Sequence, residues 1–412
     1  MQLSGDEFSS LMTRFPDIGE RFAVAVSGGA DSLALCVLAA TWAKEKGHRL
    51  VALSVDHGLR TASRQECDWV AEMLTAKGIE HHTLTWEGEK PTSGIQAAAR
   101  KARYQLMSNW CQENRIKDLM VAHHQDDQAE TFLLRLARGS GVDGLGAMRC
   151  VVQHGETRLL RPLLTVSKIR LISTLRAMGL DWIEDPSNEN DDFDRVKIRK
   201  NMALFQDLGF TSDRLSQTAQ AMQRAGDALQ RMTRNWLKEH VRLFEEGYCT
   251  IARTAMEGLD DEIRLRSLAR IGMVISGEIY PPRLERLQRL SLSLKNDRDA
   301  TLMGCRWIVR KDDILVCRET RHGEVPDNLY QIDYPHSFPA LELRILGQEG
   351  WERLLKERKS VNDVNLPKPV IYTLVSFWDE EGVLAVPHLG YQRVGSEFEA
   401  QLTFIAKKRL LS

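Results

Sequence analysis

The sequence predicts an α/β protein that begins with a twisted parallel sheet covered by helices on both faces. Over the first half of the chain, short apolar runs alternate with helix-like stretches, an order typical of parallel strands joined by crossover helices. The runs are nearly continuous, as in strands that are buried on both faces. Helical periodicity follows, and the last part turns to short strands. We therefore expect three domains: the sheet domain at 1–211, a mainly helical domain at 212–325 and a small α+β domain at 326–412.

Local patterns predict the individual elements. Four strands are expected in the first domain, at 22–26, 50–55, 81–86 and 119–123. A helix is expected to begin after Ser167, a good N-cap residue, and to stop at Gly179. From 212 to 294 apolar residues recur every three or four positions, which predicts helices. Beyond residue 301 the pattern predicts short strands at 307–310, 314–317 and 341–345.

The composition excludes several classes of protein. The chain has 412 residues, of which 43% are apolar and 27% charged, as in an ordinary globular protein. No apolar run is long enough to cross a bilayer, and the first residues lack the pattern of a secretory leader, so we expect a cytoplasmic protein without a membrane partner. The seven cysteines are scattered, with no CxxC pair and no zinc-binding spacing, which indicates reduced thiols.

Charge is balanced overall and locally basic. Because the formal net charge is only −1, any contact with nucleic acid must use a local surface. Residues 264–298 offer one, with eight Lys or Arg against three acidic residues, a local net charge of +5. Arg283, Arg286 and Arg289 repeat there every three residues on a predicted helix. They are candidates to follow RNA phosphates, and a solvated charged face is the alternative interpretation.

The loop after the first predicted strand is the first candidate site. It has the sequence Ser27-Gly28-Gly29-Ala30-Asp31-Ser32 and leads into a helix-forming stretch. Two glycines allow a sharp turn in which backbone N–H groups point at an anion over the helix N-terminus, and the serine hydroxyls add donors. Asp31 would repel phosphates unless a cation lay between them, so we expect Mg²⁺. The loop lacks the lysine of GxxxxGK[ST] and resembles instead the SGGxDS signature of PP-loop enzymes, which split ATP between its α- and β-phosphates.

The second predicted strand ends at the same edge of the sheet, where ligands bind in open α/β folds. It closes with Asp56 and His57, which are candidate contacts for the nucleotide. The alternative is structural: Asp56 caps a turn and His57 is an ordinary loop residue.

A second acidic site follows the fourth predicted strand. Asp127 and Glu130 are three residues apart, at the first turn of a predicted helix. One interpretation is structural, since Asp-x-x-Glu ahead of an apolar run is a capping box. The functional interpretation is that Asp127, with Glu130, holds Mg²⁺ or orients and deprotonates an attacking amine, because an ammonium group must lose a proton before it can attack. The adjacent His123 and His124 lack the spacing of zinc ligands.

Longer strings surround these residues. The segment 123–131 is HHQDDQAET, and Arg138-Gly-Ser-Gly141 follows it. A second block contains RPLL at 161–164, GLDW at 179–182 and DPSN at 185–188. Together these strings resemble the tRNA(Ile)-lysidine synthetase family, whose pattern has Asn where Val196 stands here. The similarity is dense over 22–202 and weak over the last ~80 residues.

The resemblance implies a two-step reaction on the wobble cytidine of an isoleucine tRNA with a CAU anticodon. The carbonyl oxygen of cytosine attacks the α-phosphate of ATP, and the ε-amine of free L-lysine then displaces AMP. Arg195 and Arg199 would supply positive charge to this chemistry together with Mg²⁺. Arg100 and Arg103 are weaker candidates of the same kind, as tRNA contacts. The expected partners are therefore ATP, Mg²⁺, lysine and the tRNA, and a homodimer is compatible with the sequence.

Two other functions compete with this one. A tRNA thiolase also adenylates a base, but it needs paired or cluster-binding cysteines, and none are paired in this sequence. A non-catalytic RNA-binding protein could keep a nucleotide fold as a scaffold. Asp31 and Asp127 argue against that alternative, because a pure binding surface gains nothing from carboxylates that face RNA.

Overall fold

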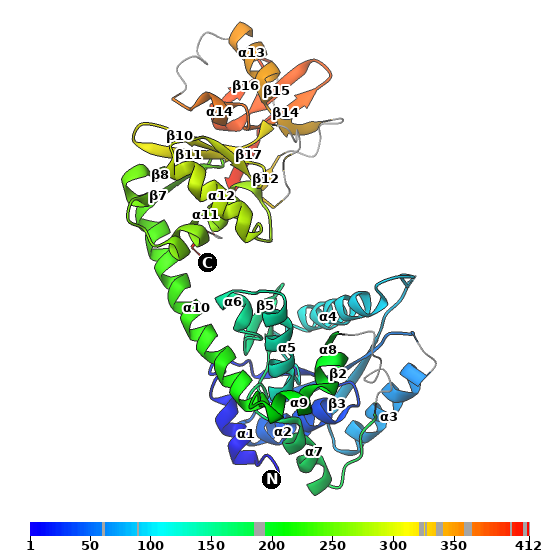
Figure 1. The fold of residues 1–412 in the computed structure, drawn as a ribbon. Coiled ribbons are helices and arrows are strands. Elements are labelled where there is room, and N and C mark those ends of the chain that lie inside the picture. The colour runs from blue at the N-terminus through cyan, green and yellow to red at the C-terminus, as the bar shows by residue number, and fades with distance from the viewer. Residues whose placement is uncertain are drawn as a thin grey trace. The chain divides into compact units, whose positions relative to one another are not determined.

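The structure is a computed structural model in which the chain divides into two compact units, Met1–Gly226 and Asp227–Ser412 (Figure 1). The division falls within α10 (Ser212–His240). The three domains expected from the sequence stay a prediction. The residues that the structure describes are 1–59, 62–88, 90–184, 194–320, 325, 328–334, 341–357, 365–395, 398–406 and 410–411.

The first unit is built on a six-stranded sheet with the order β3-β2-β1-β4-β6-β5. All neighbouring strands are parallel except β5 and β6, which form an antiparallel hairpin at one edge. The strands are β1 (Arg21–Ala25), β2 (Arg49–Asp56), β3 (Glu80–Thr85), β4 (Asp118–Met120), β5 (Val151–His154) and β6 (Thr157–Leu160). The predicted α/β class is therefore confirmed, with an antiparallel edge that the sequence analysis did not predict.

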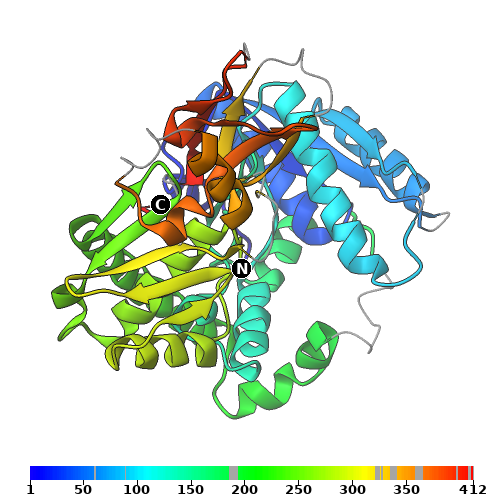
Figure 2. The ribbon, with the colours of Figure 1, turned by 90° about the horizontal axis from the view of Figure 1, so that it is seen from above.

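Helices cover both faces of this sheet, with α2 and α4 on opposite sides. The helices of this unit are α1 (Gly5–Met12), α2 (Ala30–Lys46), α3 (Ala62–Ala76), α4 (Ile95–Glu113), α5 (Gln125–Ala137), α6 (Val142–Leu145), α7 (Lys168–Ala177), α8 (Asp194–Lys200) and α9 (Met202–Asp207). Alternate residues of β1 face opposite cores: Phe22 packs with Leu33 of α2, and Ala23 packs with Met107 of α4. Figure 2 shows α4, in cyan, beside the blue strands of the sheet.

Local sequence explains where two important elements begin and end. The α7 helix begins after Ser167 as predicted, and its C-cap is followed by Gly179 at a φ of +64°. The strand β4 is shorter than the predicted 119–123, although the Val121 amide still donates to the Leu160 carbonyl at 2.9 Å. The chain therefore leaves the sheet just before His123 and His124, at the carboxyl edge where ligands of such folds bind.

The described part of the second unit combines antiparallel sheets with the end of α10 and further helices. The five-stranded sheet has the order β7-β8-β11-β10-β9, the four-stranded sheet β13-β14-β15-β16, and β12 pairs with β17. The strands are β7 (Val241–Phe244), β8 (Tyr248–Ala252), β9 (Ala300–Leu302), β10 (Cys305–Val309), β11 (Asp313–Arg318), β12 (Tyr330–Asp333), β13 (Glu342–Ile345), β14 (Val375–Asp379), β15 (Gly382–Val386), β16 (Tyr391–Gln392) and β17 (Gln401–Phe404). The helices are α11 (Asp261–Ser276), α12 (Leu284–Lys295), α13 (Gly347–Glu357) and α14 (Lys368–Ile371).

The hairpin of β7 and β8 interrupts the segment that was expected to be helical. Its turn contains Gly247 at a φ of +80°, a backbone conformation that glycine adopts without strain. The buried side chains of Ile251 and Trp307 join this sheet to the helices α11 and α12 in one core. The predicted strands at 307–310 and 314–317 correspond to β10 and β11.

All seven cysteines are unpaired, as expected. Six of them are buried and Cys150 is partly exposed. Burial raises the pKa of Cys36 and Cys111 to about 12, so these thiols stay protonated at neutral pH. Among the described residues, no helix combines the length and the apolar character needed to span a bilayer.

Candidate functional site

The loop between β1 and α2 is held by its own side chains. The Ser32 hydroxyl donates to the Gly29 carbonyl at 3.0 Å and accepts from the Ser27 amide at 3.1 Å. The Ser27 and Ser32 hydroxyls lie 3.2 Å apart. These bonds keep the turn closed before any ligand binds, which lowers the entropy lost on binding.

Gly28 is required by both conformation and space. Its φ is +83°, in the left-handed region, and its carbonyl accepts from the Ile183 amide at 2.9 Å. A Cβ at this position would lie 2.8 Å from Ile183 Cδ1 and 3.1 Å from Val70 Cγ2. The backbone at Gly28 therefore lies too close to Ile183 for residue 28 to carry a side chain.

The N-terminus of α2 is open to an anion. Gly29 is the N-cap residue and offers no side-chain cap, so the first N–H groups of the helix lack the usual side-chain acceptor. The positive end of the helix dipole points the same way. Phosphate binding by this loop stays a prediction, with which the uncapped helix N-terminus is compatible.

His124 brings two predicted acidic residues together. Its Nε2 atom lies 3.4 Å from Asp31 Oδ2 and 3.6 Å from Asp127 Oδ2. The Nδ1 atom lies 3.6 Å from Asp126 Oδ2, and only 6% of the His124 side chain is exposed. The sequence analysis considered His124 only as a zinc ligand, which its spacing argued against, and missed its central position in the site.

The charged groups of this cluster shift one another's pKa values. Burial alone would raise the pKa of Asp31, but His124, followed by Lys168 and Arg199, outweighs it and holds that pKa below its usual value. Burial likewise acts to lower the pKa of His124, and the surrounding carboxylates of Asp31, Asp127 and Asp126 raise it instead. The site therefore favours the ionised form of Asp31 and the protonated form of His124.

The acidic pair of α5 is arranged differently from the predicted capping box. The helix begins at Gln125, so Asp127 is in its first turn and Glu130 is one turn further on. The capping contact is made by Asp127 Oδ2, which accepts from the His124 amide at 3.0 Å. Glu130 does not take part in this cap.

Glu130 pairs with a predicted arginine instead. Arg199 of α8 donates from Nε to Oε1 at 2.8 Å and from Nη2 to Oε2 at 3.2 Å. This hydrogen bond raises the pKa of Arg199, as do the nearby charges of Asp127 and Asp31. Arg195, also on α8, is exposed, and its charge acts on His123. Val196 between them is buried. The predicted DPSN string at 185–188 lies outside the described residues.

Lys168 is a second residue that the sequence analysis missed. Its Nζ atom lies 3.9 Å from Asp31 Oδ2. Its amide donates to Asp126 Oδ2 at 2.9 Å, while Asp126 Oδ1 accepts from the Ser212 hydroxyl at 2.7 Å. Only the packing of α7 against α2 brings Lys168 to the loop, and no local sequence signal predicts that contact.

Two arginines of α4 each meet a histidine at the carboxyl edge of the sheet. Arg103 Nη2 lies 3.1 Å from His57 Nε2, and Arg100 Nη2 lies 3.5 Å from His123 Nε2. Burial, then Arg103, lowers the pKa of His57 to about 4, so the ring is neutral and accepts from the guanidinium. Asp56 accepts from the Gly58 amide at 2.9 Å and from the Ser63 hydroxyl at 2.8 Å.

The segment 264–298 of the second unit presents fewer positive charges on the surface than its sequence suggested. Arg264 is buried and bonded to Asp261 and to the Leu259 carbonyl. Lys295 Nζ lies 3.2 Å from Asp261 Oδ1, and the Arg266 guanidinium is paired with Glu262. Arg283, Arg286 and Arg289 remain exposed at the start and along one side of α12.

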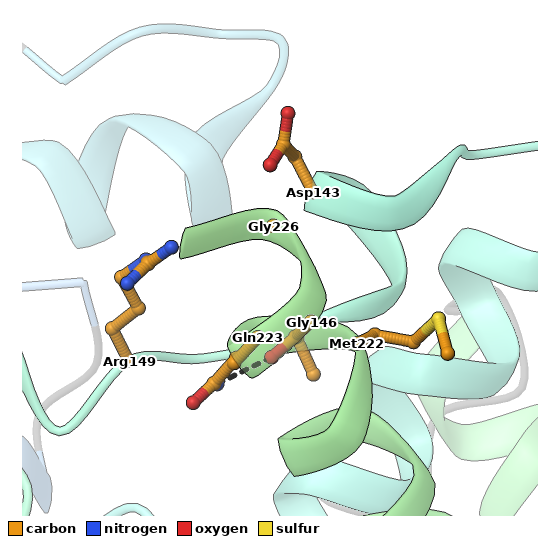
Figure 3. A pocket seen from close by; sticks show the side chains of 7 residues that line it. Asp143, Gly146, Arg149, Met222, Gln223 and Gly226 are labelled. Atoms are coloured by element: carbon orange, nitrogen blue, oxygen red, sulfur yellow. Dashed lines mark hydrogen bonds between the residues drawn. The ribbon is translucent and has the colours of Figure 1, made fainter. Parts of the chain in front are cut away.

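A small pocket in the first unit lies apart from these residues. It is lined by Asp143, Gly146, Ala147, Arg149, Met222, Gln223 and Gly226. Figure 3 shows the Gln223 amide directed at the Gly146 carbonyl, with which it is hydrogen-bonded. The cavity of about 10 Å³ has room for roughly one water molecule. It is too small for a nucleotide.

The comparisons with known proteins agree with the geometry. A sequence profile described as "PP-loop domain" matches residues 6–205. The tRNA(Ile)-lysidine synthase of Wolbachia pipientis wMel is 35% identical over 93% of this chain and 92% of its own length. The enzyme of the same name from Ruegeria pomeroyi is 35% identical over 90% of this chain and 89% of its own. That of a Bradyrhizobium species is 39% identical over 66% of this chain and 78% of its own.

Proposed function

Because the chain belongs to the tRNA(Ile)-lysidine synthase family, ATP-dependent carbon–nitrogen ligases that act on tRNA, we propose that it adenylates the wobble cytidine of a CAU-anticodon isoleucine tRNA and joins free lysine to it. One observation carries this proposal. Asp31 of the ATP loop and Asp127 of α5 converge on the same atom of His124, so the carboxylates expected for both steps lie in one site.

The first step uses the open N-terminus of α2. The loop at 27–32 supplies backbone N–H groups and hydroxyls to the triphosphate of ATP. The carbonyl oxygen of the cytosine attacks the α-phosphorus, and pyrophosphate leaves with the electron pair of the bond that breaks. The oxygen that was a poor leaving group becomes part of AMP, a good one.

The second step uses the acidic cluster. The ε-amine of lysine arrives as an ammonium ion, which a carboxylate attracts and from which it accepts a proton. Asp127 is the better placed of the two candidates because 18% of its side chain is exposed, whereas Glu130 is 4% exposed and occupied by Arg199. The free amine then attacks the activated ring carbon and AMP departs.

The arginines have separate roles in this proposal. Arg199 is held by Glu130, and 43% of its side chain is exposed, so it can also face the phosphates. Arg195 lies on the same helix. Arg100 and Arg103 are aligned by Tyr104 and His57 at the same sheet edge, where the anticodon loop must present its unstacked base. In the second unit, Arg283, Arg286 and Arg289 are proposed to contact tRNA phosphates.

Mg²⁺ fits the chemistry of the same carboxylates. Asp31 Oδ1 is buried and has no hydrogen-bond partner among the described atoms, and such an oxygen suits a cation. The described residues contain no group of three or more ligand side chains that could hold a metal on their own. We propose that Asp31 holds Mg²⁺ together with the phosphates of ATP, as is usual for this ion. Asp127 is the second candidate ligand, as the alternative to its role as the base. Bound there, Mg²⁺ would neutralise charge on the phosphates.

The competing thiolase function finds less support. Cys249 and Cys305 are enclosed in the core of the second unit, and burial raises the pKa of both thiols. Cys67, whose pKa is raised to about 11 by burial and then by Asp56, is also a poor nucleophile. The six buried thiols are therefore poorly suited to carry sulfur, and Cys150, the partly exposed one, has no paired cysteine.

The decisive experiment incubates the protein with labelled lysine, ATP, Mg²⁺ and bulk tRNA. Transfer of lysine to RNA with stoichiometric release of AMP is the expected result. Incorporation of sulfur from a sulfur donor, or RNA binding with neither reaction, would contradict the proposal.

A further inference from the structure

The ATP loop of this protein has no lysine of its own, yet a lysine lies beside it. Lys168 belongs to α7, which packs against α2 through Leu171 and Leu175. The packing brings its ammonium group 3.9 Å from Asp31 Oδ2, and Asp31 is the second residue of α2. The cation thus stands next to the open N-terminus of α2, although 137 positions of sequence separate the two residues.

The backbone of Lys168 is fixed. Its amide donates to Asp126, and Asp126 is itself held by Ser212. The Gln125 amide donates to the Val166 carbonyl at 2.9 Å, which ties the beginning of α5 to the segment ahead of α7. The start of α7 is therefore connected to the acidic cluster through several hydrogen bonds. These bonds fix the position of the Lys168 Cα atom, from which the side chain extends.

The ammonium group itself is not fixed. At 3.9 Å its contact with Asp31 is electrostatic and longer than a hydrogen bond, and 45% of the Lys168 side chain is exposed. A partly exposed ion pair of this kind contributes little stability. The group is free to turn onto an anion bound at the helix N-terminus, where its three N–H donors suit phosphate oxygens.

Resting on the proposed function, we propose that Lys168 binds the pyrophosphate portion of ATP and takes the place of the lysine that the loop lacks. When the bond between the α-phosphorus and the bridging oxygen breaks, its electron pair passes to pyrophosphate. The Lys168 ammonium then stabilises the charge that develops there. Its proximity also offsets the repulsion between Asp31 and the phosphates.

The test compares the binding of ATP with that of AMP, which lacks the pyrophosphate portion. In Lys168→Ala, the Kd for ATP is expected to rise about 10- to 100-fold, the range of a lost hydrogen bond to a charged group. The Kd for AMP is expected to change less than about twofold. Lys168→Arg, which keeps the charge, should recover most of the ATP affinity. Lys44→Ala, at the far end of α2, is the matched control for loss of one exposed lysine.

Other outcomes overturn the proposal. Equal weakening of ATP and AMP in Lys168→Ala would assign the residue to the positioning of Asp31 or of α7, and unchanged ATP affinity would remove it from the site. The thermal unfolding midpoint of each variant identifies loss of fold, and Lys168→Met then serves as a second variant of similar size. Because binding is measured without tRNA or lysine, failure of the wild-type protein to transfer lysine would leave this test intact.

Discussion

The guanidinium of Arg199 spans the carboxylate of Glu130 with two hydrogen bonds, of 2.8 and 3.2 Å, and joins α8 to α5. The Glu130 side chain is 4% exposed, so its carboxylate depends on this partner, whereas 43% of the Arg199 side chain is exposed. A buried carboxylate deprived of its partner is costly. The pair therefore serves the fold and the site together.

Arg199→Met is expected to destabilise the protein by about 1–3 kcal/mol, because it leaves the Glu130 carboxylate buried without a donor. Urea unfolding measures this change. Lys197→Met, an exposed residue of the same helix, is the control and should shift stability by less than about 0.5 kcal/mol. The double variant Arg199→Met with Glu130→Gln should be more stable than Arg199→Met alone. An additive loss in the double variant would show that the two residues are not coupled.

Asp31→Ala is expected to abolish AMP formation and to leave tRNA affinity within about twofold of wild type. Asp31 lies in the loop at 27–32, next to His124, and is not one of the exposed arginines proposed to contact tRNA. AMP release from labelled ATP and filter binding of labelled tRNA are the two measurements. Turnover at the wild-type rate in this variant would remove Asp31 from the mechanism.

Comparing Gly28→Ala with Gly29→Ala distinguishes the glycine needed for the loop conformation from the glycine that approaches the phosphates. A Cβ at Gly28 meets Ile183 at 2.8 Å and requires a φ of +83°, whereas one at Gly29 meets nothing nearer than 3.7 Å. We expect Gly28→Ala to lower the thermal unfolding midpoint and Gly29→Ala to leave it unchanged. A weaker ATP affinity in Gly29→Ala would then report close approach of the phosphates to that backbone. Equal midpoints for the two variants would contradict the geometry.

The stability of the protein is expected to fall with pH partly through His123. Burial lowers its pKa to about 4, below the ordinary 6.5, so between those values the unfolded chain binds a proton that the folded chain does not. Stability is therefore lost as the pH falls from about 6.5 towards 4. In His123→Gln the loss between pH 7 and pH 5, measured by urea unfolding, should be smaller by about 1–2 kcal/mol. An identical loss of stability in both proteins would show that folding does not lower the pKa of His123.

Arg283→Ala with Arg286→Ala is expected to weaken tRNA binding and to reduce its dependence on salt. If each side chain neutralises one phosphate, the slope of log Kd against log salt should fall by about 2 in the double variant. Arg14→Ala, an exposed arginine in the turn after α1 of the other unit, is the control. A slope equal to that of wild type would assign the two arginines to an ordinary solvated face.

Local chemistry explains what the sequence could predict. The strands β1 to β3 and the start of α7 follow from apolar runs and an N-cap residue, and the loop at 27–32 from its glycines. The hairpin of β7 and β8 had a signal, two short apolar runs around Glu245-Glu246-Gly247, that the helical periodicity on either side obscured.

Long-range contacts explain what it could not predict. The meeting of His124 with Asp31, and of Lys168 with Asp31, depends on how separate elements pack. The positive surface charge of the segment 264–298 was overstated. A count of charged residues does not show that Arg264 is buried, or that it pairs with Asp261, which lies before the segment.

The burial of six of the seven thiols has a practical consequence. An electrophilic dye should attach first at Cys150, the one partly exposed sulfur, and yield a uniformly tagged protein with no change of sequence. Cys150 shares a backbone hydrogen bond with Arg161, whose guanidinium contacts His123. Fluorescence from that position would therefore report a ligand that binds beside His123, without any substitution in the chain.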